Sequence, residues 1–147
     1  MGSYCWFDTP ILSKYGFGGY VFFAKDFENK TTDEVKNMTS SLQKAYKIPI
    51  LTAVDEEGGK VVRISSNSKL VPNKFRSPSD LYKDGGFVKI KEDTVEKSRI
   101  LNNLGINVNL APVVDVSTNP ADYMYDRTLQ ENTNLTSTYA KTVIEAS

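Results

Sequence analysis

The sequence predicts an α/β fold in which short strands alternate with helices and pair in parallel. Apolar runs of strand length recur along the chain, and segments with a helical spacing of apolar residues separate them. The order strand, helix, strand, helix, strand favours parallel pairing with right-handed crossovers. The 147 residues suit one domain, because compact domains cluster around roughly 100 to 150 residues.

The first strand and helix of this series lie between residues 18 and 47. Gly18–Ala24 is almost wholly apolar and rich in aromatic residues, which is typical of a strand buried on both faces. Thr31 is the predicted N-cap of the following helix, because Glu34 stands at the capping-box spacing. The helix is expected to end near Lys47, before a proline. Its apolar stripe comprises Val35, Met38, Leu42, Ala45 and Tyr46.

The second strand is predicted at Ile50–Val54, and a cluster of carboxylates follows it directly. Asp55, Glu56 and Glu57 precede the flexible pair Gly58-Gly59. In parallel β/α folds, ligands bind at the carboxyl ends of the strands. The sequence therefore places a candidate ligand site immediately after this strand.

The remainder of the chain is predicted to contain a loop, a strand and two helices. Residues 65–91 are rich in Ser, Asn, Pro, Gly and Lys without sustained periodicity, which is typical of a long surface loop. A helix over Asp93–Leu104 should have Gly105 as its C′ residue, and Val108–Val114 is the third strand. A final helix near Thr133–Ala146 would pack behind that strand. The inward residues expected in the first of these helices are Val95, Ile100, Leu101 and Leu104.

Composition excludes several classes of function. Lys plus Arg equal Asp plus Glu at 18 each, so no summed field draws the chain toward nucleic acid or an anionic membrane. No apolar run approaches the roughly 20 residues that span a bilayer. The absence of histidine excludes Ser-His-Asp and Cys-His catalysis and most zinc chemistry within this chain, and no metal or cofactor is expected. The lone Cys5 cannot form an internal disulfide and defines no compartment.

A nucleotide-binding, doubly wound domain would share the alternation of strands and helices. Such a domain needs a glycine-rich first turn that leads into a helix, and a P-loop needs Gly-Lys-Ser/Thr at the start of a helix. Gly59-Lys60 instead leads into Val61-Val62, a β-type run. The sequence therefore disfavours nucleotide binding.

Two long motifs resemble landmarks of glycoside hydrolase family 3. Val54–Arg63 is similar to the family's D-[QE]-E-G-G-x-V-x-R signature, and Gly105–Val116 is similar to its G-[IL]-[ND]-x-[ND]-x-A-P-V-x-D-V element. Gly16–Gly19 resembles the run before the family's first strand. Asp126–Thr128 resembles a short Arg-Ser or Arg-Thr element, with Leu129-Gln130 where the family usually has Phe-Gly. Together the motifs look most like the bacterial β-N-acetylhexosaminidase branch.

Asp55, Arg63 and Arg127 are the candidate substrate-binding residues. A carboxylate can accept two sugar hydroxyls in charge-assisted bonds, and an arginine can donate to a hydroxyl and a carboxylate at once. The resemblance implies that Asp55 holds the hydroxyls of the non-reducing sugar and that both arginines contact the same sugar. The alternatives are a helix or turn cap for Asp55 and an exposed salt bridge from Arg63 to Glu56 or Glu57.

Asp115, Glu57, Gly58 and Gly59 are expected to support this site. Asp115 follows the third strand and would either orient an arginine or backbone groups or touch the sugar. Glu56 and Glu57 are adjacent, so their side chains should point apart and make structural hydrogen bonds. The two glycines would let the chain turn sharply beneath the ligand.

The resemblance implies a TIM (β/α)8 barrel, of which residues 1–147 form a single partial domain, the first half. A complete barrel needs about 250 residues and eight strands, whereas this sequence offers three clear strands and at most one more near Tyr4–Phe7. Open strand edges favour self-association. In the family, the nucleophile Asp comes from a later strand and the branch's proton donor comes from a His-containing loop. No catalytic residue is therefore expected in this chain.

The chain is expected to supply the sugar-binding part of a retaining glycoside hydrolase and to be inactive alone. The full-length parent would hydrolyse N-acetylglucosamine-type glycosides, such as cell-wall fragments. The alternative is a non-enzymatic carbohydrate-binding or assembly module built from half a barrel. Tyr123 and Tyr125, in a polar loop near Arg127, are placed either to cover a sugar face or to pack within the loop.

Overall fold

The computed structural model describes residues 16–147, which form a three-stranded parallel sheet with helices packed against it. The strand predicted near Tyr4–Phe7 lies outside the described residues. The strands follow the order β1-β2-β3, so the predicted parallel α/β fold is confirmed. In chain order the elements are β1 (Gly19–Phe22), α2 (Ala24–Phe27), α3 (Thr32–Lys44), β2 (Leu51–Val54), α4 (Pro78–Asn103), β3 (Val108–Asn109), the 3₁₀ helix η1 (Tyr125–Arg127) and α5 (Thr133–Ala146).

Only one face of the sheet is covered by helices. Phe22 pairs in register with Val54, and both side chains are fully buried. On the opposite face, Val21 is 40% exposed and Leu51 is 59% exposed. The prediction that the first strand is buried on both faces is therefore wrong. Its apolar character is real, but within residues 16–147 no layer packs against the second face.

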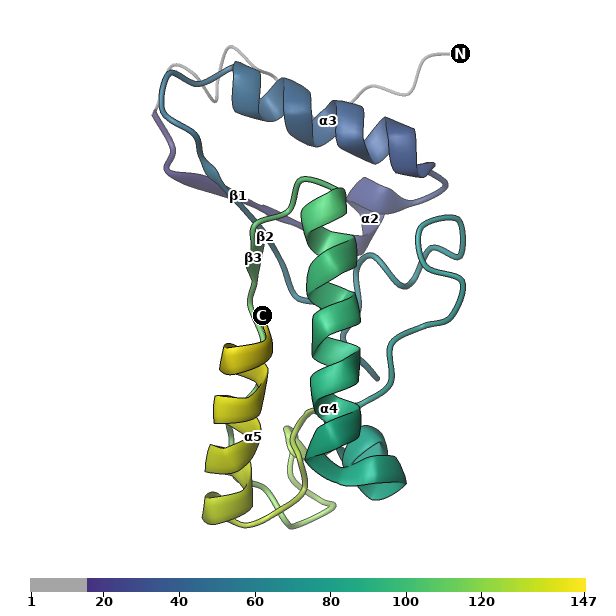
Figure 1. The fold of residues 1–147 in the computed structure, drawn as a ribbon, viewed down its shortest axis with the longest axis vertical. Coiled ribbons are helices and arrows are strands. Elements are labelled where there is room, and N and C mark those ends of the chain that lie inside the picture. Colours follow the sequence, from purple (N-terminus) through teal and green to yellow (C-terminus); the bar gives the residue numbers. More distant parts are fainter. Residues whose placement is uncertain (1–15) are drawn as a thin grey trace.

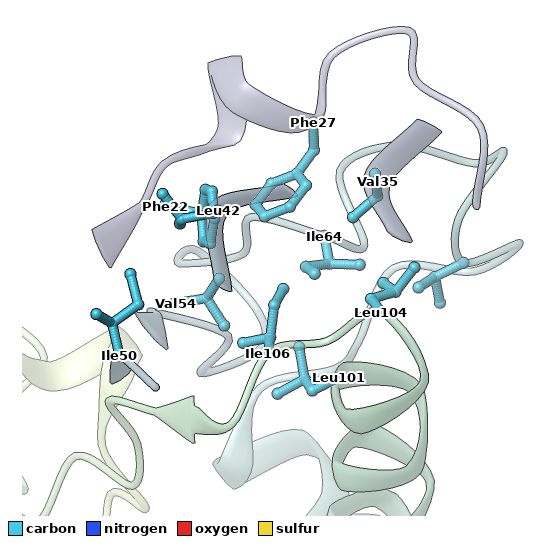
Figure 2. Packing of buried hydrophobic residues seen from close by; sticks show 11 residues of the cluster. Phe22, Phe27, Val35, Leu42, Ile50, Val54, Ile64, Leu101, Leu104 and Ile106 are labelled. Atoms are coloured by element: carbon cyan, nitrogen blue, oxygen red, sulfur yellow. The ribbon is translucent and has the colours of Figure 1, made fainter. Parts of the chain in front are cut away.

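The main core lies between the sheet and helices α3 and α4. Figure 2 shows the apolar side chains of the strands meeting those of both helices and of the loop after β2. In Figure 1, α4 and α5 run side by side, while α3 lies at the end of the molecule away from α5. The core residues are Phe22, Phe27, Val35, Leu42, Ile50, Val54, Ile64, Val71, Leu101, Leu104 and Ile106. The carboxyl end of β2 is therefore supported by a well-packed core.

Helix α3 begins as predicted. The Thr31 hydroxyl accepts from the Glu34 amide at 3.4 Å, and the Glu34 carboxylate accepts from the Thr31 amide at 2.7 Å. This reciprocal pair is a capping box, which satisfies two backbone donors at the start of the helix. The last helical residue is Lys44, so the helix ends slightly before the expected Lys47.

Helix α4 begins far earlier than the sequence indicated. Residues 65–77 lie outside helices and strands, but the predicted loop is wrong for residues 78–91, which belong to α4. Ser77 caps the helix by accepting from the Asp80 amide at 3.2 Å, and Pro78 occupies its first turn, a favoured position because no amide donor is needed there. The glycine pair 85–86 has non-helical backbone angles. It interrupts the helical spacing of apolar residues in the sequence.

The end of α4 and the third strand differ from expectation in detail. Leu101 and Leu104 are buried as predicted, whereas Val95 is 49% exposed and its inward assignment is wrong. Gly105 has φ +76°, which confirms its place as the C′ residue. Strand β3 covers two residues and does not reach Val114, because the chain soon meets Pro112, which has no amide to give to a ladder. Helix α5 has the predicted bounds.

Candidate functional site

Three consecutive carboxylates at the carboxyl end of β2 point to three different partners. Asp55 pairs with Arg63, Glu56 turns into the loop backbone that follows, and Glu57 pairs with Arg127. The expectation that Glu56 and Glu57 point apart and make structural hydrogen bonds is confirmed. Adjacent residues at a strand end alternate in direction, so one short segment organises three parts of the site.

The structure brings Asp55 and Arg63 together. Arg63 Nη2 lies 3.0 Å from Asp55 Oδ2, and the two side chains are 23% and 26% exposed. The Arg63 guanidinium also lies over the Phe23 ring at 5.7 Å from its centroid, a cation–π arrangement. Asp55 Oδ1 accepts no hydrogen bond from residues 16–147. The pair is half-buried, and within the described residues Asp55 keeps an oxygen that can accept from a ligand.

Arg127 reaches the same strand end from a segment 70 residues away. Its Nε donates to Glu57 Oε2 at 2.9 Å and its Nη2 donates to Oε1 at 2.6 Å, a bidentate pair. The hydrogen bonds with Glu57 raise the pKa of the Arg127 guanidinium above its ordinary value, against the opposing effect of burial, and the charge of Asp55 acts in the same direction as Glu57. Asp55, a member of the other ion pair, therefore acts electrostatically on Arg127.

A second ion pair ties η1 to the strand loop. Lys60, which follows Gly59, pairs with Asp126 of η1, while Arg127 of the same helix pairs with Glu57. The Lys60–Asp126 pair is exposed and contributes little by itself. With the Glu57–Arg127 pair, it connects η1 to the segment after β2 at two points.

Glu56 is buried, and its carboxylate binds the backbone of the loop that carries Arg63. Its side chain is 0% exposed and its carboxylate accepts from the amides of Arg63 at 2.7 Å and Ile64 at 2.6 Å. The Ser65 hydroxyl donates to the other oxygen at 2.5 Å. Asn109 holds the Glu56 backbone from β3, since its Oδ1 accepts from Glu56 N at 3.0 Å and its Nδ2 donates to Glu56 O at 3.1 Å.

The glycine pair after Glu57 was expected to lie beneath a ligand, but it packs against the backbone of residues 76 and 77. Gly58 has φ +98° and Gly59 has φ +63°, so the predicted sharp turn is present. A Cβ on Gly58 would lie 2.1 Å from the Arg76 carbonyl oxygen, and one on Gly59 would lie 2.7 Å from Ser77 Cβ. The glycines therefore permit a close approach of two backbone segments, and this approach is their evident structural requirement.

The remaining candidates are less well connected. Asp115 is exposed, and within the described part of the chain it makes no hydrogen bond or ion pair with Arg63 or Arg127; a bracing contact is not seen. Tyr123 is 91% exposed, and Tyr125 is half-buried. Residues 16–147 contain no cluster of acidic, cysteine or histidine side chains that could hold a metal ion, and none of their helices is long and apolar enough to cross a membrane.

Sequence reasoning missed two residues that the structure connects to the site. Asn109 lies inside the second motif, where its amide replaces backbone pairing at the end of β3. Lys97 is buried in α4 and reaches the Glu57 carbonyl oxygen at 3.3 Å. In the sequence, Lys97 is marked only by its i, i+4 spacing from Asp93. Such a spacing is common on solvent-exposed helices.

The fold and site define a parallel β/α protein with paired carboxylates and arginines at the carboxyl ends of its strands. Comparison with known families identifies it further: a family described as the glycosyl hydrolase family 3 N terminal domain matches residues 8–147. The chain belongs to this family.

Individual relatives agree with that membership. The chain is 32% identical over 130 residues to Beta-hexosaminidase A of Pseudoalteromonas piscicida, covering 84% of the chain and 21% of that protein. It is 33% identical over 75 residues to Beta-hexosaminidase LpqI of Mycobacterium tuberculosis, covering 51% and 19%. The chain thus spans about a fifth of each of these two proteins.

Solved structures show the same fold. A glycoside hydrolase family 3 β-N-acetylglucosaminidase from Paenibacillus sp. str. FPU-7 aligns with TM-score 0.81 at 21% identity, covering 94% of this chain and 26% of that one. The structure of LpqI from M. tuberculosis aligns with TM-score 0.77 at 23% identity, covering 94% and 39%. The expected TIM-barrel-like α/β architecture, present here in part, is confirmed.

Proposed function

We propose that this chain forms the sugar-binding part of a β-N-acetylhexosaminidase-type glycoside hydrolase. The observation that carries the proposal is the convergence of the Asp55–Arg63 and Glu57–Arg127 pairs at the carboxyl end of β2. In β/α barrels this end carries the ligand site. The similarity to hexosaminidases supports an N-acetylglucosamine-type sugar as the ligand.

The proposed recognition uses hydrogen bonds to sugar hydroxyls. Asp55 Oδ1, which has no donor among residues 16–147, would accept from one hydroxyl. The remaining donors of Arg63 and Arg127 would bind ring hydroxyls or the acetamido oxygen. Glu57 would hold Arg127 in place, and Asp115 would contribute only if the ligand draws it into the site. Because both arginines are already paired, little side-chain freedom remains to be lost on binding.

We further propose that the 147-residue chain does not hydrolyse glycosides by itself. Retaining glycosidases place two catalytic groups about 5 to 5.5 Å apart, but the carboxylates of this site are engaged with arginines and backbone amides. A nitrophenyl N-acetylglucosaminide assay of the purified chain should show no turnover. Turnover that disappears with Asp55→Asn would contradict this proposal, whereas sugar binding without turnover in a naturally 147-residue protein would favour the non-enzymatic module.

Asp55→Asn tests the binding role. The substitution keeps the size of the side chain but removes its charge and one of its two acceptor oxygens. The amide side chain could then not accept from both Arg63 and a sugar hydroxyl, so the affinity for N-acetylglucosamine should fall about tenfold, the effect of losing roughly one charge-assisted hydrogen bond. Titration of the chain with N-acetylglucosamine, followed by amide NMR shifts, measures the change. Asp84→Asn is the matched control, because Asp84 of α4 forms an exposed pair with Arg76, which precedes the helix. Equal losses in both variants would remove Asp55 from the site.

The open face of the sheet supports a second proposal, association of two copies of this chain. Val21, Leu51 and Leu110 are 40%, 59% and 49% exposed, and the formal net charge is +0, so little repulsion opposes contact between copies. Exposed apolar patches and sheet edges are typical association sites. A second copy would offer the same apolar face.

Leu51→Lys should shift the chain toward the monomer. A lysine on the apolar face would have to be desolvated in a dimer, so the dissociation constant should rise at least tenfold. Sedimentation velocity of the wild type and the variant measures the shift. Val88→Lys makes the same chemical change on α4, where Val88 is 70% exposed, and should leave the assembly intact. A wild-type chain that sediments as a monomer at micromolar concentration rules out the dimer.

A further inference from the structure

Lys97 of α4 is a buried cation directly beneath the proposed sugar site. The residue is 8% exposed, and its Nζ lies 3.1 Å from Asp93 Oδ2. The same Nζ donates to the Glu57 carbonyl oxygen at 3.3 Å and lies 5.0 Å from the centre of the Phe75 ring. One helix side chain therefore contacts both the strand end and the loop that packs beneath it.

These contacts exceed what a helix-stabilising ion pair requires. An ion pair between residues four apart on a helix forms readily in solvent, whereas a buried ammonium is costly unless all its donors find partners. Asp93 supplies one partner from the helix itself. The bond to Glu57 O leaves the helix and fixes the peptide unit of the residue whose carboxylate binds Arg127.

Helix α5 closes the other side of this polar cluster. Tyr139 is 4% exposed, and burial raises the pKa of its hydroxyl, with the carboxylates of Glu57 and Asp93 acting in the same direction. Glu57, Asp93, Lys97 and Tyr139 line one small cavity between α4, α5 and the end of β2. The Glu57 peptide is thus bonded to Lys97 of the buried cluster, while its carboxylate is bonded to Arg127.

We propose that Lys97, paired with Asp93, is a positioning residue for Arg127 and acts through the backbone and carboxylate of Glu57. The proposal rests on the proposed sugar-binding function for its consequence, because a displaced Arg127 would bind the sugar less well. Without the ammonium, Glu57 O loses a donor and the carboxylates of Asp93 and Glu57 repel each other across the cavity. Glu57 would then shift relative to Arg127.

A double-mutant cycle separates positioning from general stabilisation. Lys97→Met should weaken N-acetylglucosamine binding about fivefold in the wild-type background, by amide-shift titration of the chain. In the Arg127→Met background it should cause no further loss, because the residue through which it acts is gone. Lys89→Met is the matched control, since Lys89 forms an exposed pair with Glu92 on the same helix. Equal fold losses in both backgrounds would overturn the proposal.

A second readout does not depend on sugar. The Arg127 Nε proton, bonded to Glu57 Oε2 at 2.9 Å, should exchange with solvent at least fivefold faster in Lys97→Met and unchanged in Lys89→Met. Asp93→Asn, which preserves the shape of the side chain, should also speed the exchange of the Arg127 Nε proton. This variant replaces Lys97→Met in the test if Lys97→Met does not fold. Unchanged Nε exchange in the folded variants defeats the positioning role. Absence of sugar binding in the wild type would instead defeat the proposed function while leaving this exchange test decisive for Lys97.

Discussion

Replacing Gly58 with alanine is expected to lower the free energy of unfolding by about 4 kcal/mol, a large part of the stability of an ordinary domain. Gly58 has φ +98°, and an added Cβ would lie 2.1 Å from the carbonyl oxygen and 3.0 Å from the carbonyl carbon of Arg76. The clash is with backbone, which cannot rotate away. Overpacking of about 1 to 3 kcal/mol therefore adds to a conformational strain of similar size. Urea denaturation followed by far-UV circular dichroism measures the loss.

Gly86→Ala is the control for the strain alone. Gly86 also has a positive φ, +61°, but no atom lies within 4 Å of its added Cβ. Its loss should be about 2 kcal/mol smaller than that of Gly58→Ala, because only the backbone strain is shared. Equal losses at the two positions would show that the approach of residues 58 and 76 does not limit stability.

The elements that sequence reasoning placed correctly carry their determinants locally. The capping box of Thr31 and Glu34 is complete within four residues, and α5 begins at the Asn132 cap and has the predicted bounds. Asp55 and Arg63 stand eight residues apart in one motif and lie together in the structure, although the only ion-pair partners expected for Arg63 were Glu56 and Glu57. Such features can be predicted because chain connectivity already brings the partners close together.

The features that the sequence concealed depend on distant partners or on conflicting local signals. The pair between Glu57 and Arg127 joins residues 70 positions apart, and no local pattern specifies it. The start of α4 carries a valid Ser77-Pro78 cap, but the later glycine pair and the polar composition outweighed it. Val95 was assigned inward from spacing alone, whereas the helix presents Lys97 and Leu101 to the interior.

Glu56→Gln is expected to cost about 3 kcal/mol of unfolding free energy. The buried carboxylate accepts from two backbone amides at 2.7 Å and 2.6 Å and from the Ser65 hydroxyl at 2.5 Å. An amide side chain has one oxygen fewer, so its NH₂ group must face a donor and leave it unsatisfied. Losing a buried hydrogen bond to a charged group costs about 1.5 to 3 kcal/mol, and the unpaired donor adds to this. Urea denaturation compares the variant with the wild type.

The same substitution links the core of the loop to the sugar site, and two controls isolate that link. Arg63 takes its backbone position from Glu56, so Glu56→Gln should also weaken N-acetylglucosamine binding about tenfold in the fraction that remains folded. Ser65→Ala removes the hydroxyl that donates to Glu56 and accepts from the Phe75 amide at 3.2 Å but keeps the carboxylate, and should cost about 2 kcal/mol with little effect on binding. Glu92→Gln alters an exposed pair with Lys89 and should leave stability and binding unchanged. If Glu56→Gln behaves like Glu92→Gln, the buried carboxylate does not organise the loop, and Arg63 must be held by its pair with Asp55 alone.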